Sequence, residues 1–363
     1  MRRAALVGVM LTLSTSSAAQ RVGPRALAPT PRCEVVRRGL DVAAFEGLSG
    51  ESELWLEADP VGAFLAWRDT EPGTLRLRRL NDEALPVGET RVLGRAVSRF
   101  VMSPTPSGVA VAAVEGGREV LVSRVSVANE GQNVPRVVAT VPEGVASLSM
   151  VPGSTGLSLV WSALDTRAMT GLGLDSRGVP RGPGVPLGSG DAVRLVRLAT
   201  ADATLLFYNE SPTQTMVATL GSGLALTSHV RWPLGAAGPV EMGGAVYSVQ
   251  PLLNGHLVLY RMLPGAVVPV TMPDISLAVG MRPVRAVGAG PVVLAEAREG
   301  NNSAVLVRLF SDGSSSTLGS VRPWPSGQPL SIEARGSGWM VTREVGARGS
   351  LRLGVLRVRC EGT

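Results

Sequence analysis

The run GAFLAW, residues 62–67, sets a pattern that recurs along the whole chain: a glycine followed by an apolar segment with the character of a β-strand. The pattern returns as GVAVAA from Gly108, GLSLVW from Gly156, ATLLFY from Ala203, GAVYSV from Gly244, GPVVLA from Gly290 and GWMVTR from Gly338. The steps between these seven anchors are roughly 41 to 48 residues. A period of this length indicates a fold built by repeating one supersecondary unit.

Each unit contains the same succession of strand-like segments. A strand precedes the anchor, as residues 98–102 precede Gly108, and the anchored strand follows. After a turn such as Glu71-Pro72-Gly73 comes a third strand, as at 74–80, and then a more polar fourth strand, as at 89–93. No amphipathic helical window of ten or more residues stands out. The sequence therefore predicts an all-β chain.

Four strands of falling hydrophobicity in a unit of this length resemble a blade of the β-propeller superfamily, and the resemblance covers residues 33–363. It implies a single domain with seven four-stranded blades; a count of six or eight would follow if one period were misread. The Gly-His and Trp-Asp pairs of WD40 repeats and the double glycine of kelch repeats are absent. Ser311-Asp312-Gly313 is only a partial match to the aspartate box of sialidase-like propellers. No subfamily follows, and a row of β-sandwich domains is the alternative fold.

The two ends of the predicted domain suggest how a ring would close. The last unit lacks its fourth strand, whereas residues 33–37 form a strand with no unit before it. Placed at the rim of the last blade, antiparallel to residues 351–360, this strand would complete the blade and bring Cys33 beside Cys360. These are the two cysteines of the chain, and a lone pair in an exported protein indicates a disulfide. The alternatives are two free thiols or a metal site, for which His229 and His256 give no usable spacing.

The first 19 residues have the features of a secretory signal peptide. Arg2 and Arg3 precede an apolar segment at 4–13, and Ser17-Ala18-Ala19 supplies small residues for cleavage. Residues 20–32 are proline-rich and predict a flexible leader. No apolar run is long enough to span a bilayer. We therefore expect a protein exported to the periplasm or the cell exterior of a bacterium, with no membrane span.

The net charge of +6 comes from arginine and not from lysine. Many arginines alternate with apolar residues, as in Leu75-Arg76-Leu77-Arg78, which places them on the solvated faces of strands. No arginine run is longer than a pair, so the charge does not indicate a nucleic-acid partner.

A group of arginines on predicted inner strands offers a candidate ligand site in the central channel. Arg99, Arg194 and Arg285 are the principal candidates, because several arginines around a narrow hub can hold a carboxylate or phosphate. The competing interpretation is that they are solvated charges at strand ends. Further charged residues expected on inner strands are Arg197, Arg335, Glu241 and Glu333.

Aromatic residues and histidines give weaker indications. Trp67, Trp161 and Tyr208 occupy similar places in their units, which favours packing between blades over a binding platform. Trp232 and Trp324 stand beside prolines and are better candidates for exposed contacts in loops. His229 and His256 are interpreted as surface residues without a catalytic partner.

The sequence contains little that indicates catalysis. It has no nucleophile elbow, no calcium loop and no Cys/His spacing for zinc, so no catalytic residue, metal or cofactor is predicted. The carboxylates Glu51 and Glu53 lie near a predicted inner strand, but spacing alone does not make them a pair. The favoured function is a monomeric, non-catalytic binding or scaffold protein that contacts protein or polysaccharide through its loops. The alternative is a propeller enzyme, a glycan hydrolase or lyase or a lactonase-like enzyme, with its active site at the channel mouth.

Overall fold

The structure is a computed structural model, and it describes part of the 363-residue chain. The described residues are 33–40, 44–49, 52–59, 62–127, 134–153, 155–198, 203–221 and 223–232, followed by ten separate strands between 240 and 360. The predicted signal peptide, the leader and His256, Trp324, Glu333 and Arg335 lie outside these residues.

The described elements are β-strands joined into antiparallel sheets, which confirms the all-β prediction for this part of the chain. Six sheets have four strands each, and within each sheet every strand pairs with its neighbour in sequence. In chain order, the first sheet contains β2 (Glu53–Asp59), β3 (Gly62–Arg68), β4 (Leu75–Asn81) and β5 (Pro86–Gly94), and the second contains β6 (Val97–Thr105), β7 (Gly108–Glu115), β8 (Glu119–Ser126) and β9 (Arg136–Thr140). The third sheet contains β10 (Val145–Pro152), β11 (Leu157–Ala163), β12 (Ala168–Leu174) and β13 (Val185–Ser189). The fourth sheet contains β14 (Asp191–Leu198), β15 (Ala203–Ser211), β16 (Gln214–Leu220) and β17 (Leu226–Trp232).

The remaining strands continue the same order along the chain. Two further four-stranded sheets contain β18 (Val240–Met242), β19 (Ala245–Pro251), β20 (Leu257–Leu263) and β21 (Ala266–Val270); β22 (Arg282–Ala286), β23 (Val292–Glu296), β24 (Ala304–Leu309) and β25 (Ser315–Val321). A three-stranded sheet has the order β1 (Cys33–Leu40), β27 (Leu351–Cys360) and β26 (Ser337–Val345).

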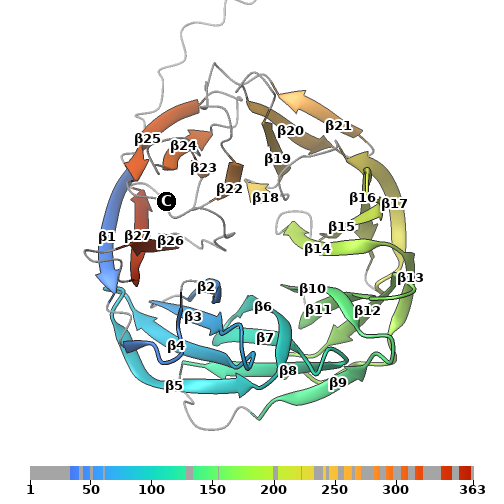
Figure 1. Cartoon of the computed structure of the whole chain (residues 1–363). Coiled ribbons are helices and arrows are strands. Elements are labelled where there is room, and N and C mark those ends of the chain that lie inside the picture. Colours follow the sequence, from blue (N-terminus) through green and yellow to red (C-terminus); the bar gives the residue numbers. More distant parts are fainter. Residues whose placement is uncertain are drawn as a thin grey trace, which may run out of the picture.

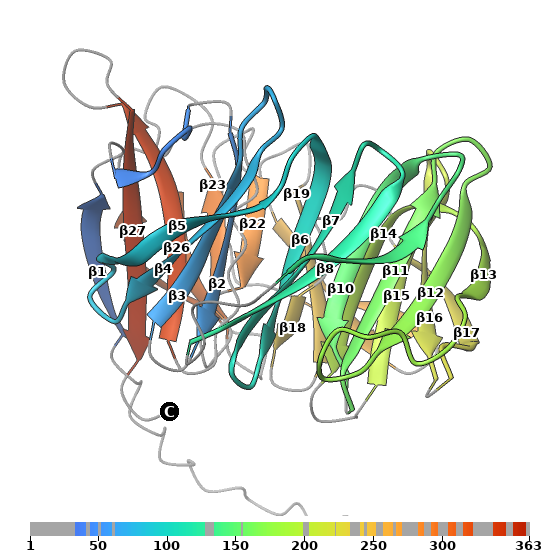
Figure 2. The ribbon, with the colours of Figure 1, turned by 90° about the horizontal axis from the view of Figure 1, so that it is seen from below.

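The sheets stand side by side around a central space. Figure 1 shows the first strand of each four-stranded sheet toward the centre and the fourth strand at the rim. Figure 2 shows the same sheets from the side, where neighbouring sheets lie next to one another. Four-stranded antiparallel sheets in this radial arrangement are those of a β-propeller. They exclude separate β-sandwiches, in which two sheets would pack face to face, as the arrangement of the described part.

Apolar cores fill the spaces between neighbouring sheets. On β7, Val109 and Val111 pack toward the sheet of β2–β5, whereas Ala110 and Ala112 pack toward the sheet of β10–β13. Successive side chains of a strand point to opposite faces, so a strand between two cores must be apolar at every position. This is why the repeated phrase is a continuous apolar run rather than an alternating one.

The anchor glycines are required because a neighbouring strand passes very close. At Gly108, φ is +152° and an added Cβ would lie far inside contact distance of the carbonyl oxygen of Val125 on the next strand. A comparable collision with backbone would occur at Gly62 and Gly156. The sequence repeat therefore marks a repeated close approach of two backbones.

We expect Gly108→Ala to lower the free energy of unfolding by at least about 1 kcal/mol, because the new methyl group forces strands β7 and β8 apart at an unfavourable φ. Urea denaturation measures the change. Gly173→Ala is the matched control, since a Cβ at that glycine meets nothing within 4 Å. Equal stability of the two variants would contradict this account of the repeat.

Two backbone N–H groups at the free edge of the inner strand β14 find hydrogen-bond acceptors on the sheet before it. The hydroxyl of Ser147 on β10 accepts a hydrogen bond from the backbone N–H of Val193 at 3.0 Å. The hydroxyl of Ser149 accepts one from the backbone N–H of Leu195 at 2.8 Å. Unpaired edge groups of a sheet are costly when buried. These two bonds therefore hold β14 and β10, the first strands of two neighbouring sheets, against each other.

The N-terminal strand pairs with the C-terminal one. β1 lies antiparallel to β27, in a register that makes Cys33 and Cys360 direct partners and continues to Leu40 opposite Leu353. The inner strand expected for this sheet would fall near Glu333 and Arg335, outside the described residues. Three strands of the last unit are therefore described, with β1 on its outer side (Figure 1).

Candidate functional site

The three arginines predicted for the channel occupy equivalent positions on their inner strands. Each of β6, β14 and β22 has a register shift near its start, and the first paired residue after the shift is Arg99, Arg194 and Arg285 respectively. β10 has the same shift, with Ser147 after it. A bulge bends the strand and redirects the side chain beside it. The shared bulge was not predicted from the sequence.

The side chains at this level differ in exposure. Arg99 is exposed and Arg194 is half-buried, and the sheet that carries Ser147 lies between them. For Arg285 and Glu241 the structure describes the strand but not the side chain. The three arginines thus share an equivalent register position on their strands, and the structure describes the side chains of Arg99 and Arg194.

Arg197 does not belong to this group. It lies further along β14, and its Nη1 donates to the hydroxyl of Thr204 on β15 at 3.2 Å. This contact holds the side chain on its own sheet.

The three aromatic residues at similar places in their units are core residues, as predicted. Trp67 is fully buried, and Trp161 and Tyr208 are each 6% exposed. Trp161 packs into the core shared with the sheet of β6–β9, and Tyr208 into the core shared with the sheet of β10–β13. They therefore do not form a binding platform.

The interpretation of Trp232 as an exposed contact is wrong. Trp232 is the last residue of β17 and is 3% exposed. Its ring packs edge-on against Phe207, with 5.1 Å between the ring centroids. The adjacent proline suggested a loop, but the side chain closes the outer end of an apolar cluster, and burial of that ring decides its position.

His229 is an exposed residue of β17, as predicted for a surface histidine. Its Nδ1 lies 3.0 Å from the hydroxyl of Tyr208. Burial raises the pKa of the Tyr208 phenol, and the nearby carboxylate of Glu210 raises it further. The contact between the two side chains is a hydrogen bond that links β15 and β17 across the sheet.

Two acidic residues of β2, Glu53 and Glu57, differ in their partners and in their burial. Glu53 forms an ion pair with Arg68 at 3.1 Å across the pair β2–β3. Glu57, which the sequence did not single out, is 1% exposed and accepts from Trp55 Nε1 at 3.2 Å. Glu51 lies outside the described residues. In the described part of the chain no three His, Cys, Asp or Glu side chains gather as metal ligands.

The fold is the feature that comparison with known proteins supports. No protein-family model matches the chain, and no curated protein sequence matches it. A puromycin-hydrolysing peptidase of Mycobacterium tuberculosis is similar in structure, with a TM-score of 0.53 and 14% identity over 83% of this chain and 51% of the peptidase. This chain therefore spans about half the length of that enzyme.

Two other solved structures are similar over nearly their whole length. BBS1N, solved in complex with ARL6DN, has a TM-score of 0.53 at 11% identity, covering 88% of this chain and 94% of its own. The mitotic checkpoint complex contributes a chain with a TM-score of 0.53 at 12% identity, with 98% and 99% covered. At such identities the likeness establishes the fold alone, which is a β-propeller, and leaves the subfamily open.

Proposed function

We propose that the chain forms one closed seven-bladed propeller in which β1 completes the last blade. The proposal is supported by six four-stranded sheets in chain order and by a further sheet that joins the first and last described strands. Closure of this kind covers the apolar faces of the two terminal sheets, which an open row of sheets would expose to water.

A Cys33–Cys360 disulfide would make this closure covalent. Directly opposed residues of antiparallel strands have Cα atoms about 4.5 to 5.5 Å apart, within the range of about 4.4 to 6.8 Å that disulfides require. The register of β1 and β27 gives the two cysteines this relationship. A disulfide agrees with export to the periplasm or the cell exterior.

The function that the molecule supports best is that of an exported, non-catalytic binding or scaffold propeller for a protein or a polysaccharide. This proposal rests on Arg99, Arg194 and Arg285, which occupy equivalent positions on the inner strands β6, β14 and β22. Arginines at these positions would present cationic groups at one mouth of the channel. Arginine binds carboxylates and phosphates through two parallel hydrogen bonds. Two of the similar structures, BBS1N with ARL6DN and the mitotic checkpoint complex, are protein assemblies by their names.

The alternative is a propeller enzyme with its active site at the same mouth. The likeness to a peptidase favours it only at the level of the fold, which does not determine activity. Metal analysis of the purified protein and a screen against glycosides and lactones separate the two. Turnover or one bound metal ion per chain would replace the binding function with the enzymatic one.

For the channel mouth, we expect sulfate and citrate to raise the melting temperature of the protein and the Arg99→Gln/Arg194→Gln double variant to lose that shift. The effect should weaken as NaCl rises, because partly exposed charges are screened over about 8 Å at physiological ionic strength. Arg118→Gln, at an exposed turn after β7, is the matched control and should keep the shift. A wild-type protein indifferent to both anions would refute the channel site.

A further inference from the structure

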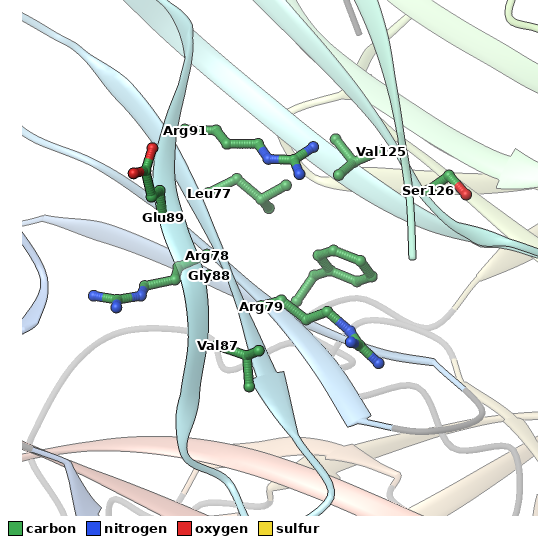
Figure 3. A pocket seen from close by; sticks show the side chains of 10 residues that line it. Leu77, Arg78, Arg79, Val87, Gly88, Glu89, Arg91, Val125 and Ser126 are labelled. Carbon is green, nitrogen blue, oxygen red and sulfur yellow. The ribbon is translucent and has the colours of Figure 1, made fainter. Parts of the chain in front are cut away.

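The hollow between β4, β5 and β8 (Figure 3) does not provide a ligand site. It has room for about one water molecule, and the side chains of Phe64, Leu77 and Val125 at its floor are each at most 2% exposed. These three side chains belong to the apolar core between the two sheets.

A cluster of charged residues where the sheets of β6–β9 and β10–β13 meet offers more. Three arginines surround one carboxylate there. Arg124 lies near the end of β8, and Asp175, Arg177 and Arg181 lie in the segment that joins β12 to β13. The two sheets are neighbours in the ring (Figure 1) and share an apolar core.

This charged cluster lies at the opposite end of its sheet from the channel residue Arg99. Arg124 pairs with Ala110, and Ala110 pairs with Ser103 on β6. Ser103 lies four residues further along β6 than Arg99. At about 3.3 Å per residue, the two levels are about 13 Å apart along the strand. The cluster is therefore separate from the channel site.

Asp175 holds the turn of the cluster in shape. Its Oδ1 accepts hydrogen bonds from the backbone N–H of Arg177 at 2.7 Å and from that of Val179 at 2.9 Å. The pKa of the carboxyl is lowered, first by the bond from Val179 and then by the bond and the charge of Arg177 and by the charge of Arg181, against a smaller opposing effect of burial. The group is therefore ionised, and no described residue donates a hydrogen bond to its Oδ2.

The same turn covers the stem of Arg124. A Cβ added at Gly178 would lie 3.8 Å from Cγ of Arg124 and 3.2 Å from a methyl group of Val122. Burial lowers the pKa of the Arg124 guanidinium, and the charge of Asp175 offsets part of that effect. Among the described residues, none accepts a hydrogen bond from this guanidinium. A half-buried charge without such a bond is costly, and a bound anion would remove that cost.

The other two guanidinium groups come from the exposed side of the turn. Arg181 is oriented, because its Nη1 and Nη2 donate to the hydroxyl and the carbonyl of Thr155, between β10 and β11. Arg177 is exposed, and within the described part of the chain its guanidinium has no hydrogen-bond acceptor. Three positive charges and one negative charge leave the cluster with an excess of positive charge.

We propose that this cluster binds inorganic phosphate, as the hydrogen phosphate dianion. The two negative charges of the ion balance the excess of the cluster, and its charged oxygens accept hydrogen bonds from the guanidinium groups. Its O–H group donates to Oδ2 of Asp175. Sulfate and the dianion of a phosphate monoester have a similar shape and charge but no such proton, so each would meet the carboxylate as a like charge. The carboxylate therefore selects free phosphate over both. This site is independent of the function proposed for the channel.

Titration calorimetry of the full-length protein at pH 8 with inorganic phosphate, sulfate and methyl phosphate tests the site. We expect phosphate to bind at least about tenfold more tightly than either of the other anions, since each lacks the hydrogen bond to Asp175. Arg177→Gln should weaken phosphate binding at least about tenfold. Arg118→Gln, at an exposed turn before β8 and at the other end of the sheet, should leave it unchanged.

Asp175→Asn tests the selectivity while keeping the turn. Asparagine retains the oxygen that accepts from Arg177 and Val179, but it replaces Oδ2 with a donor. The preference for phosphate over sulfate should therefore fall at least about tenfold, with the melting temperature serving as the check on folding.

The channel variant separates the two sites. The Arg99→Gln/Arg194→Gln protein should keep the preference for phosphate, so failure at the channel and failure at this cluster give different results. Equal affinity of the wild type for phosphate and sulfate would overturn the proposal, as would full phosphate affinity in Arg177→Gln. An unchanged preference in folded Asp175→Asn, or no phosphate binding by the wild type, would overturn it as well.

Discussion

Replacing Cys33 or Cys360 by serine should lower the free energy of unfolding by up to about 5 kcal/mol, one of the two largest effects expected in this molecule. The bond would enclose nearly the whole described chain, and the entropy that a cross-link removes from the unfolded state grows with the length of the enclosed loop. The fold itself should survive, because β1 and β27 remain paired along eight residues of each strand. Urea denaturation of the oxidised protein measures the change.

The reduced wild type and the double serine variant supply the controls. If the disulfide is the cause, either single variant should be as unstable as the double variant, since breaking one bond twice has no further effect. A reducing agent should destabilise the wild type and leave the double variant unchanged. Two alkylatable thiols in protein prepared from an oxidising compartment would contradict the prediction, and β1 would then be held by hydrogen bonds and packing alone.

The sequence predicted those features of the fold that repeat. Gly62, Gly108 and Gly156 could be recognised because the same close approach of two strands recurs and allows no side chain each time. Trp161 and Tyr208 were assigned correctly to the core because a position shared between units is usually set by packing between them. Periodicity thus carried the information on both the strands and the cores.

Features that occur once, or that depend on register, could not be predicted. Trp232 was assigned to a loop because of its neighbouring proline, whereas its contact with Phe207 is made across the sheet. The bulges before Arg99 and Arg194 are shifts in pairing between two strands, and neither strand alone contains that information. The bulge of β5 opposite Arg78 is likewise a property of its pairing with β4, which neither strand alone contains.

The second large effect is expected at Trp67. Its side chain is fully buried, its ring packs edge-on against Phe45 with 5.5 Å between the centroids, and its Nε1 donates to the carbonyl of Glu46 at 3.0 Å. Trp67→Ala removes the largest side chain among the fully buried residues and leaves a cavity. We expect a loss of about 3 to 5 kcal/mol in the free energy of unfolding, measured by urea denaturation.

The substitution Trp67→Phe separates the ring from its hydrogen bond. Phenylalanine keeps most of the packing against Phe45 but lacks the N–H, so it should cost less than alanine, about 1 kcal/mol for the lost hydrogen bond to Glu46, which is an exposed residue. Leu164→Ala is the surface control, because that leucine is 58% exposed, and it should change stability by less than about 0.5 kcal/mol. If Trp67→Ala proved as stable as the wild type while weakening a ligand, the repeated aromatic position would be a binding platform after all. A large loss of stability instead assigns Trp67 to the packing that holds the segment with Phe45 and Glu46 against β3.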